Sequence, residues 1–249
     1  MRKLPISLTL YTTTKGHFGC KTNYQHTVKS LSNQISIKEF GSATAHIKIS
    51  EGEMEGGLEM SEFLSKAGLN ILSTEKNWNR EGNNHAEGYF QDMMVMMNSE
   101  SVHKNEFILF LEDDWIINTD KLDFWLSEGV KCLKKNKDIL CVRINDEINK
   151  DVSRATSINK YIYTQDSDYT IYGPTLTFQP TLMRTRDWYA AVRHINKDWE
   201  KVKNQHCELI SGYYMHSLFS NSPTPFAFFD PEKINATHIG TEKFAKENL

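Results

Sequence analysis

Three consecutive carboxylates follow an unbroken apolar run in this chain. Residues 107–111 are all apolar, and Glu112, Asp113 and Asp114 come directly after them. The run predicts a buried strand that delivers the acids to one edge of a sheet. Neighbouring carboxylates repel one another unless a cation or strong hydrogen-bond donors hold them ionised. The pattern therefore indicates a divalent-metal site; the simpler interpretation is a solvated loop whose acids cap the next helix.

Strand-like and helix-like periods alternate through the first 145 residues. This alternation predicts an α/β domain with a parallel sheet. Strands are predicted in residues 6–14, 43–50, 69–74, 107–111 and 139–145. Helices are predicted around residues 24–35, 60–67, 86–98 and 122–133. In the third of these, helical spacing predicts one core-facing stripe of Tyr89, Phe90, Met93, Met94 and Met97.

The pattern changes beyond about Asn145. Residues 169–185 are strand-like, but Gly173-Pro174 and Gln179-Pro180 interrupt them, so bends or edge strands are expected there. Two further helices are predicted around residues 188–195 and 210–218, and a last strand begins near Phe226. The closing segment after that strand is expected to be irregular.

Composition bounds the class of protein. The 249 residues are 39% hydrophobic and 24% charged, which is enough for a full core. Twenty-nine basic and 32 acidic residues give a net charge of -3, so no overall basic field attracts nucleic acid or an anionic membrane. No apolar run approaches the roughly 20 residues of a membrane span, and no signal-peptide core is present, so a cytoplasmic protein is expected. Four dispersed cysteines suggest neither a disulfide framework nor a zinc site, and we expect them to be reduced, mostly core residues: Cys20, Cys132, Cys141 and Cys207.

Four features in chain order resemble the GT-A fold of nucleotide-sugar-dependent glycosyltransferases, most closely the family 2 type. They are a first strand ending in Thr12, Thr13 and Thr14 with a later polar turn, the triplet where the family carries its DxD motif, the acceptor-like segments 182–192 and 206–218, and the C-terminal run Thr237-His238-Ile239-Gly240. The resemblance covers most of the chain. It implies an α/β, Rossmann-like fold with a mostly parallel central sheet flanked by helices in one domain, 1–249. Residues 1–118 would form the nucleotide-sugar half and 119–249 the acceptor half.

The same resemblance implies a metal site. Asp114 would coordinate Mn²⁺ or Mg²⁺, while Glu112 and Asp113 would contact the ribose or metal-bound water. His238 would complete the coordination sphere, and a nitrogen ligand favours Mn²⁺. Such a metal neutralises the charge that develops on the departing nucleoside diphosphate. For His238 the alternative is an ordinary structural histidine, one of nine in the chain.

Other residues would contact the donor. Thr12 and Thr13 would meet the nucleotide, although they also suit a simple strand end. Arg80, in the polar turn at residues 77–85, would pair with the diphosphate unless it is a plain surface residue. Trp115 favours packing over stacking on a sugar.

An inverting transfer needs a general base for the acceptor hydroxyl. The resemblance points to Glu208 at the start of a predicted helix; the family usually has an acidic pair there, whereas Cys207 precedes Glu208 here. Asp198 and Glu200 are alternatives, and a first-turn acid that only stabilises the helix is the simpler interpretation of Glu208. A retaining mechanism stays open.

Three functions compete at this point. The first is sugar transfer from a nucleoside-diphosphate sugar to a hydroxyl on a glycan, a lipid-linked precursor, a protein or a hydroxylated DNA base, so that nucleic acid enters only as an acceptor. The second is a metal-dependent phosphoesterase or nuclease, for which Asp146 and Glu147 are the only further ligands offered. The third is an inactive sugar-binding module. Arg184 and Arg186 either hold an acceptor anion or flank a helix start. The oligomeric state is open.

Overall fold

The structure of the 249-residue chain is a computed structural model. It describes residues 4–13, 40–49, 58, 61–62, 65–66, 70–75, 94, 96–110, 115–117, 122–137, 139–143, 169–172, 180–202, 226–229 and 236–238.

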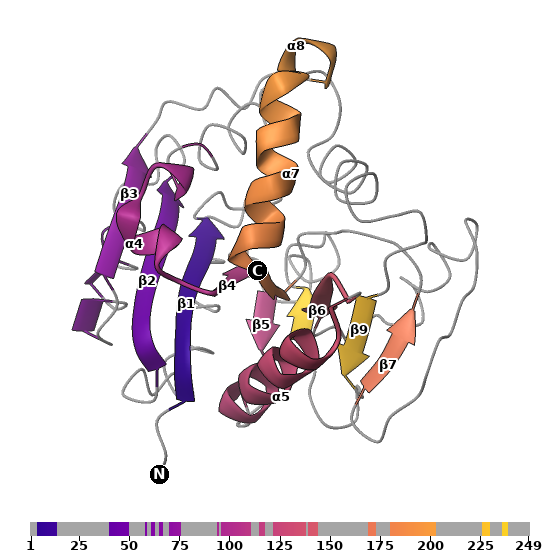
Figure 1. The fold of residues 1–249 in the computed structure, drawn as a ribbon. Coiled ribbons are helices and arrows are strands. Elements are labelled where there is room, and N and C mark those ends of the chain that lie inside the picture. The colour runs from indigo at the N-terminus through magenta and orange to yellow at the C-terminus, as the bar shows by residue number, and fades with distance from the viewer. Residues whose placement is uncertain are drawn as a thin grey trace, which may run out of the picture.

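An eight-stranded sheet forms the frame, in the order β3-β2-β1-β4-β8-β6-β9-β7 (Figure 1). The strands are β1 (Leu4–Thr13), β2 (Phe40–Ile49), β3 (Asn70–Glu75), β4 (Phe107–Phe110), β6 (Cys141–Arg143), β7 (Tyr169–Tyr172), β8 (Thr181–Arg184) and β9 (Phe226–Phe229). Pairings β3-β2, β2-β1, β1-β4 and β6-β9 are parallel. Strand β8 runs antiparallel to β4 and β6, and β7 runs antiparallel to β9.

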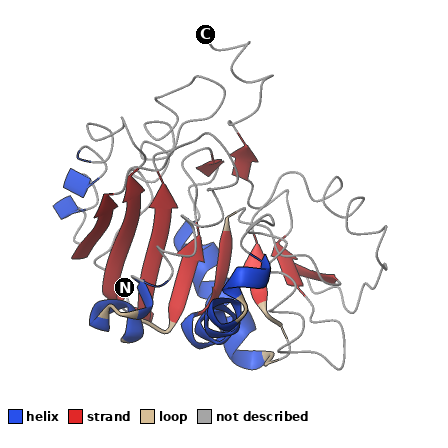
Figure 2. Cartoon of the chain, turned by 90° about the horizontal axis from the view of Figure 1, so that it is seen from above, coloured by secondary structure: helices blue, strands red, loops and turns tan. Residues whose placement is uncertain are grey.

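A second, two-stranded sheet is formed by β5 (Trp115–Ile117) and β10 (Ala236–His238), which pair antiparallel. Neither short strand is predicted from the sequence, because three residues are too few to show an alternating pattern. Figure 2 shows this pair apart from the large sheet.

The middle of the large sheet is deeply buried. All four residues of β4 are buried, and the apolar run predicts this correctly. In β8, Leu182 and Met183 are almost fully enclosed, as are Cys141 and Val142 of β6. A strand covered on both faces reads as a continuous apolar run, because it has no solvent-facing side.

Four helices are bounded: α4 (Glu100–His103), α5 (Leu122–Lys135), α7 (Thr185–Lys197) and α8 (Trp199–Val202). Helix α5 presses closely on the sheet, since a Cβ added at Gly129 would lie 3.0 Å from Leu182 Cδ2 and 3.6 Å from Val142 Cγ1. Helix α7 covers the helix predicted around residues 188–195 and buries one stripe of side chains: Trp188, Ala191, Val192 and Ile195. Helix α5 covers the helix predicted around residues 122–133 and buries Leu126, Val130 and Leu133.

The predictions for individual segments have different outcomes. Strand β7 ends just before Gly173, and β8 begins just after Pro180, so the prolines separate two strands as expected. In the methionine segment Met96 is fully buried, and Met94 and Met97 are half-buried, while the other residues of the predicted stripe lie outside the described residues. Cys132 and Cys141 are free and buried, as expected. The predicted helix at residues 210–218 lies outside the described residues.

Candidate functional site

Two neighbouring parallel strands end at the same edge of the large sheet. Tyr11 of β1 is level with Phe110, the last residue of β4. Thr12 and Thr13 therefore carry β1 past the point where β4 ends, and the acidic triplet begins two residues after Phe110 in the sequence. We call the edge marked by Thr13 and Phe110 the carboxyl edge. Thr12 and Thr13, which are predicted to contact the donor, lie at this edge.

The small sheet joins the C-terminal part of the chain to this region. His238 is paired with Trp115, the residue that follows Asp114 in the sequence. Residues opposed in an antiparallel pair have Cα atoms about 4.5–5.5 Å apart. The backbone of His238 is therefore held beside the end of the triplet segment. Trp115 itself is 3% exposed, which fits its predicted packing role.

Several predicted site residues lie outside the described residues: Arg80, Glu112, Asp113, Asp114 and Glu208. For Thr12, Thr13 and His238 only the backbone is described. Their individual roles therefore stay predictions. Within the described part of the chain, no three histidine, cysteine, aspartate or glutamate side chains cluster as a metal site.

Two residues missed by the sequence analysis also stand at the carboxyl edge. Thr181, the first residue of β8, pairs with Phe110 on one side and with Arg143 on the other. Its hydroxyl is buried and lacks a hydrogen-bond partner among the described residues. Arg143 is the last residue of β6, and only its backbone is described. An arginine in the otherwise apolar strand 139–145 is the signal that could have revealed it.

At the opposite edge, marked by Phe107 and Arg184 and called the amino edge, the arginine has a structural role. Its guanidinium donates to the carbonyl oxygens of Leu133 (3.2 Å), Asn136 (2.7 Å) and Ile139 (2.9 Å). It thus satisfies backbone acceptors at and just beyond the end of α5. Arg184 is also the N-cap residue of α7, so the interpretation as a residue flanking a helix start is confirmed.

Asp187, which the sequence analysis missed, holds this arginine in place. Its carboxylate accepts from Arg184 Nη1 at 2.7 Å and from Arg186 Nε at 3.2 Å. The Arg184 and Asp187 side chains are each 8% exposed, whereas that of Arg186 is 67% exposed. A buried aspartate in the first turn of α7, three residues after an arginine, is the signal that could have indicated this pair.

The alternative base candidates lie near α8. Asp198 Oδ1 accepts a hydrogen bond from Lys201 Nζ at 2.9 Å, and this contact raises the pKa of Lys201. Glu200 is exposed in the first turn of α8. Asp198 is therefore already engaged in an ion pair at the surface.

Comparison with solved structures relates this architecture to known proteins. A crystal structure of GalNAc-T7 with UDP, GalNAc and Mn²⁺ matches at a TM-score of 0.55 and 10% identity, over 94% of this chain and 44% of that chain. The fold is GT-A-like. S. aureus TarS 1–349 matches at a TM-score of 0.46 and 14% identity, over 90% of this chain and 58% of that chain. This chain thus spans about half the length of these structures.

Comparisons with protein-family models and with curated proteins find no match. Among the helices that the structure describes, none combines the length and apolar character needed to cross a bilayer.

Proposed function

We propose that this chain is a glycosyltransferase that moves a sugar from a nucleoside-diphosphate donor to a hydroxyl acceptor, with metal assistance and inversion at the sugar. One observation carries the proposal. Strand register sets the ends of β1 and β4 at one edge of the large sheet, and in the small sheet it sets His238 opposite Trp115, the residue after Asp114 in the sequence. In open α/β sheets, ligands bind outside the carboxyl ends of the strands.

The donor set around this edge suits Mn²⁺ or Mg²⁺. Carboxylates are the ligands both ions prefer, and one imidazole favours Mn²⁺. In the proposal Asp114 and His238 hold the metal, and the pairing of His238 with Trp115 supports this assignment. The metal would act as a Lewis acid on the diphosphate. Glu112 and Asp113 bind the ribose or water.

The donor is proposed to be a UDP-sugar, by analogy with the UDP in the GalNAc-T7 structure. Thr12 and Thr13, at the end of β1, contact the nucleotide in this proposal, and Arg80 pairs with the diphosphate. Residues 1–118 then bind the donor and 119–249 the acceptor, within one domain. Arg143, level with Thr181 and two strands from Phe110, is a further cation for the diphosphate.

Glu208 is the proposed general base. It removes the proton from the acceptor hydroxyl as that oxygen attacks the sugar carbon from the face opposite the diphosphate. The sugar–phosphate bond breaks, and its electron pair leaves with the diphosphate. The acceptor class is a glycan, a lipid-linked precursor, a protein or a hydroxylated DNA base.

The test is release of nucleoside diphosphate from a panel of nucleotide sugars in the presence of Mn²⁺ and candidate acceptors. Asp114→Ala is expected to lower the rate at least about a hundredfold, equivalent to about 2.7 kcal/mol in activation free energy. Glu100→Ala is the matched control, because that side chain is 83% exposed and pairs only with Lys104 among the described residues. Equal loss in both variants would contradict the metal role.

A second variant tests the base. Glu208→Gln is expected to bind donor normally and to lose transfer by about a hundredfold or more, since general-base catalysis contributes about 10²–10⁴-fold. Transfer at the wild-type rate would exclude this assignment. Cleavage of phosphodiesters without any nucleotide sugar would instead identify a phosphoesterase, and donor binding without turnover an inactive binding module.

A further inference from the structure

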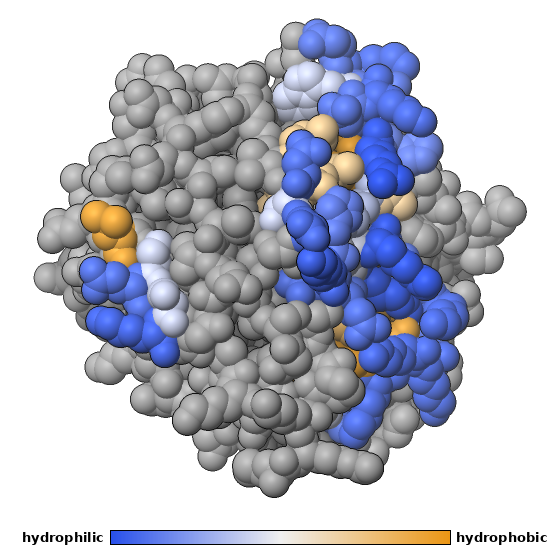
Figure 3. Space-filling view, turned by 60° about the vertical axis from the view of Figure 1, so that its left-hand side comes forward, coloured by the Kyte–Doolittle hydropathy of each residue, from blue (hydrophilic) through white to orange (hydrophobic). Residues whose placement is uncertain are grey.

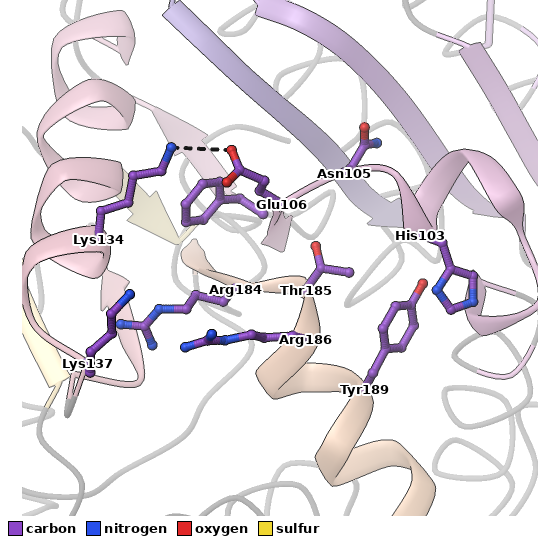
Figure 4. A pocket seen from close by; sticks show the side chains of 10 residues that line it. His103, Asn105, Glu106, Lys134, Lys137, Arg184, Thr185, Arg186 and Tyr189 are labelled. Atoms are coloured by element: carbon purple, nitrogen blue, oxygen red, sulfur yellow. Dashed lines mark hydrogen bonds and ion pairs between the residues drawn. The ribbon is translucent and has the colours of Figure 1, made fainter.

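A separate hollow lies at the amino edge. It is a pocket of about 410 Å³ between the start of β4, the end of α5 and the start of α7 (Figure 4). Phe107, the first residue of β4, lines it, while Phe110 at the other end of β4 marks the carboxyl edge. Because a strand rises about 3.3 Å per residue, the pocket is separated from that edge by about 10 Å of strand. The pocket is therefore distinct from the proposed donor site.

Positive charge predominates around this pocket. Lys134, Lys137, Arg184 and Arg186 line it, and two carboxylates, Glu106 in the lining and Asp187 behind the arginines, oppose them. With His103 counted as neutral, four cations and two anions leave a formal excess of two positive charges. Figure 3 shows that the described residues on one face are mainly hydrophilic, in keeping with the exposed lysines and arginines of α5 and α7.

The excess positive charge of the pocket lies on particular side chains. Lys134 Nζ is paired with Glu106 Oε2 at 3.3 Å and lies 5.7 Å from the centre of the Phe107 ring. Arg184 is occupied by backbone carbonyls and by Asp187. Lys137, in contrast, makes no ion pair or hydrogen bond among the described residues, and exposed Arg186 shares Asp187 with the buried arginine. Lys137 and Arg186 are therefore the cations available to a ligand.

The start of α7 adds hydrogen-bond donors. Arg184, Thr185 and Arg186, the first residues around this helix terminus, all line the pocket. The cap has no side-chain hydrogen bond, but the Thr185 amide already donates to the Glu106 carbonyl oxygen at 2.9 Å, so an anion would meet the amides that follow it in the first turn. Thr185 is 4% exposed, and its hydroxyl lacks any hydrogen-bond partner among the described residues. Figure 4 shows that hydroxyl on the same side of the pocket as Glu106.

We infer that this pocket is a second anion site, which binds the phosphate group of a small molecule. A phosphate monoester carries a charge of about -1.5 to -2 at neutral pH, which matches the excess positive charge. The planar guanidinium of Arg186 would form a forked contact with the phosphate, and Lys137 would contribute a point charge. The Thr185 hydroxyl would donate a further hydrogen bond. The volume exceeds that of phosphate alone and falls in the range of small-ligand pockets, about 300–1,000 Å³. The ligand is thus expected to be a phosphate ester.

The test is calorimetric titration of the full chain, without divalent metal, first with inorganic phosphate and then with a hexose phosphate at constant ionic strength. Saturable binding of phosphate below about 10 mM and tighter binding of the ester are expected. Lys137→Ala and Arg186→Ala should each weaken binding about tenfold. Lys135→Ala and Lys197→Ala, which remove exposed lysines outside the lining of this pocket, should bind as the wild type does.

Thr185→Val removes the hydroxyl while keeping the side-chain shape, so the free protein should be no less stable to urea while phosphate binding weakens. The inference is overturned if the wild type binds neither ligand, or if Lys137→Ala and Arg186→Ala bind like the two control variants. Tighter binding of phosphate than of the ester would also overturn the assignment to a phosphorylated small molecule. UDP and Mn²⁺ binding should be unchanged in all these variants, because the donor edge is separate.

Discussion

Arg184 connects three elements through a single buried side chain. It lies at the end of β8, caps the carbonyls at the end of α5 and pairs with Asp187 of α7. Arg184→Ala leaves these acceptors and the aspartate without the guanidinium. Removing one partner of a buried pair costs about 3–5 kcal/mol, so the free energy of unfolding in urea should fall by about that amount. Arg186→Ala, at a side chain 67% exposed, should cost less than about 1 kcal/mol; a similar loss in both would contradict the structural role.

The buried hydroxyl of Tyr189 makes the free energy of unfolding depend on pH. Burial raises the pKa of Tyr189 to about 12 from 10.0, while nearby Arg193 lowers it slightly. Its hydroxyl donates to the Met96 carbonyl oxygen at 3.3 Å, which also requires the neutral form. The folded protein thus holds the proton more tightly than the unfolded chain, so this contribution is complete below pH 10 and is lost as pH rises toward about 12.

Tyr189→Phe tests this dependence, because it removes the ionisable hydroxyl and keeps the ring. Urea unfolding across that pH interval should show a steeper loss of stability in the wild type than in the variant. Equal slopes would mean that Tyr189 ionises as easily when folded as when unfolded.

At the residue scale, the sequence predicted which side chains are buried better than it predicted their hydrogen-bond and ion-pair partners. The stripe of α7 follows from spacing alone, because one helix determines which residues share a face. The Arg184 network depends on carbonyls of α5, about fifty positions earlier in the chain, and on the turn that follows that helix. No local pattern encodes such a contact.

At the element scale, α5 packs closely on the sheet because Gly129 has no side chain. A Cβ at Gly129 would meet Leu182 Cδ2 at 3.0 Å, and Leu182 is fully buried. Helix propensity alone would favour Gly129→Ala by about 1 kcal/mol, whereas overpacking costs about 1–3 kcal/mol. Because the buried leucine has little room to move, we expect thermal unfolding of Gly129→Ala at a lower temperature. Glu128→Ala, on the same turn, should change stability little; a stabilised glycine variant would show that the helix can shift.

The strands of the large sheet were predictable because each has its own short apolar run or apolar–polar alternation. The order of these strands in the sheet was not predictable. Strand β8 lies between β4 and β6, and it pairs there with residues far away in the sequence. The β5-β10 pair was missed altogether. Each strand has three residues, and their pairing depends on the chain returning from its C-terminal part.

At the scale of the whole molecule, different ligands are proposed for the two edges of the sheet. At the carboxyl edge Thr13 extends past Phe110, and in the small sheet the backbone of His238 is paired with Trp115. The amino edge has the basic pocket at Phe107 and Thr185. Sequence spacing could propose the first edge, because strand ends carry the acids and threonines. For the second edge the sequence offered Arg184 and Arg186 as possible anion ligands, but not the pocket, because that pocket is built from a strand start, a helix end and a helix start.

The long return of the chain to the carboxyl edge allows a final prediction. Because β10 holds His238 opposite Trp115, the proposed imidazole ligand depends on the small sheet. His238→Ala should weaken Mn²⁺ binding in the presence of UDP by about tenfold or more, and Mg²⁺ binding by less, since nitrogen ligands favour Mn²⁺. Calorimetric titration with each metal measures the difference. His194→Ala, an exposed histidine in the last turn of α7, is the control. If His238→Ala weakens the binding of both metals equally, or of neither, the result would mean that His238 contributes packing rather than a ligand. Asp114 and nearby acids would then bind the metal alone.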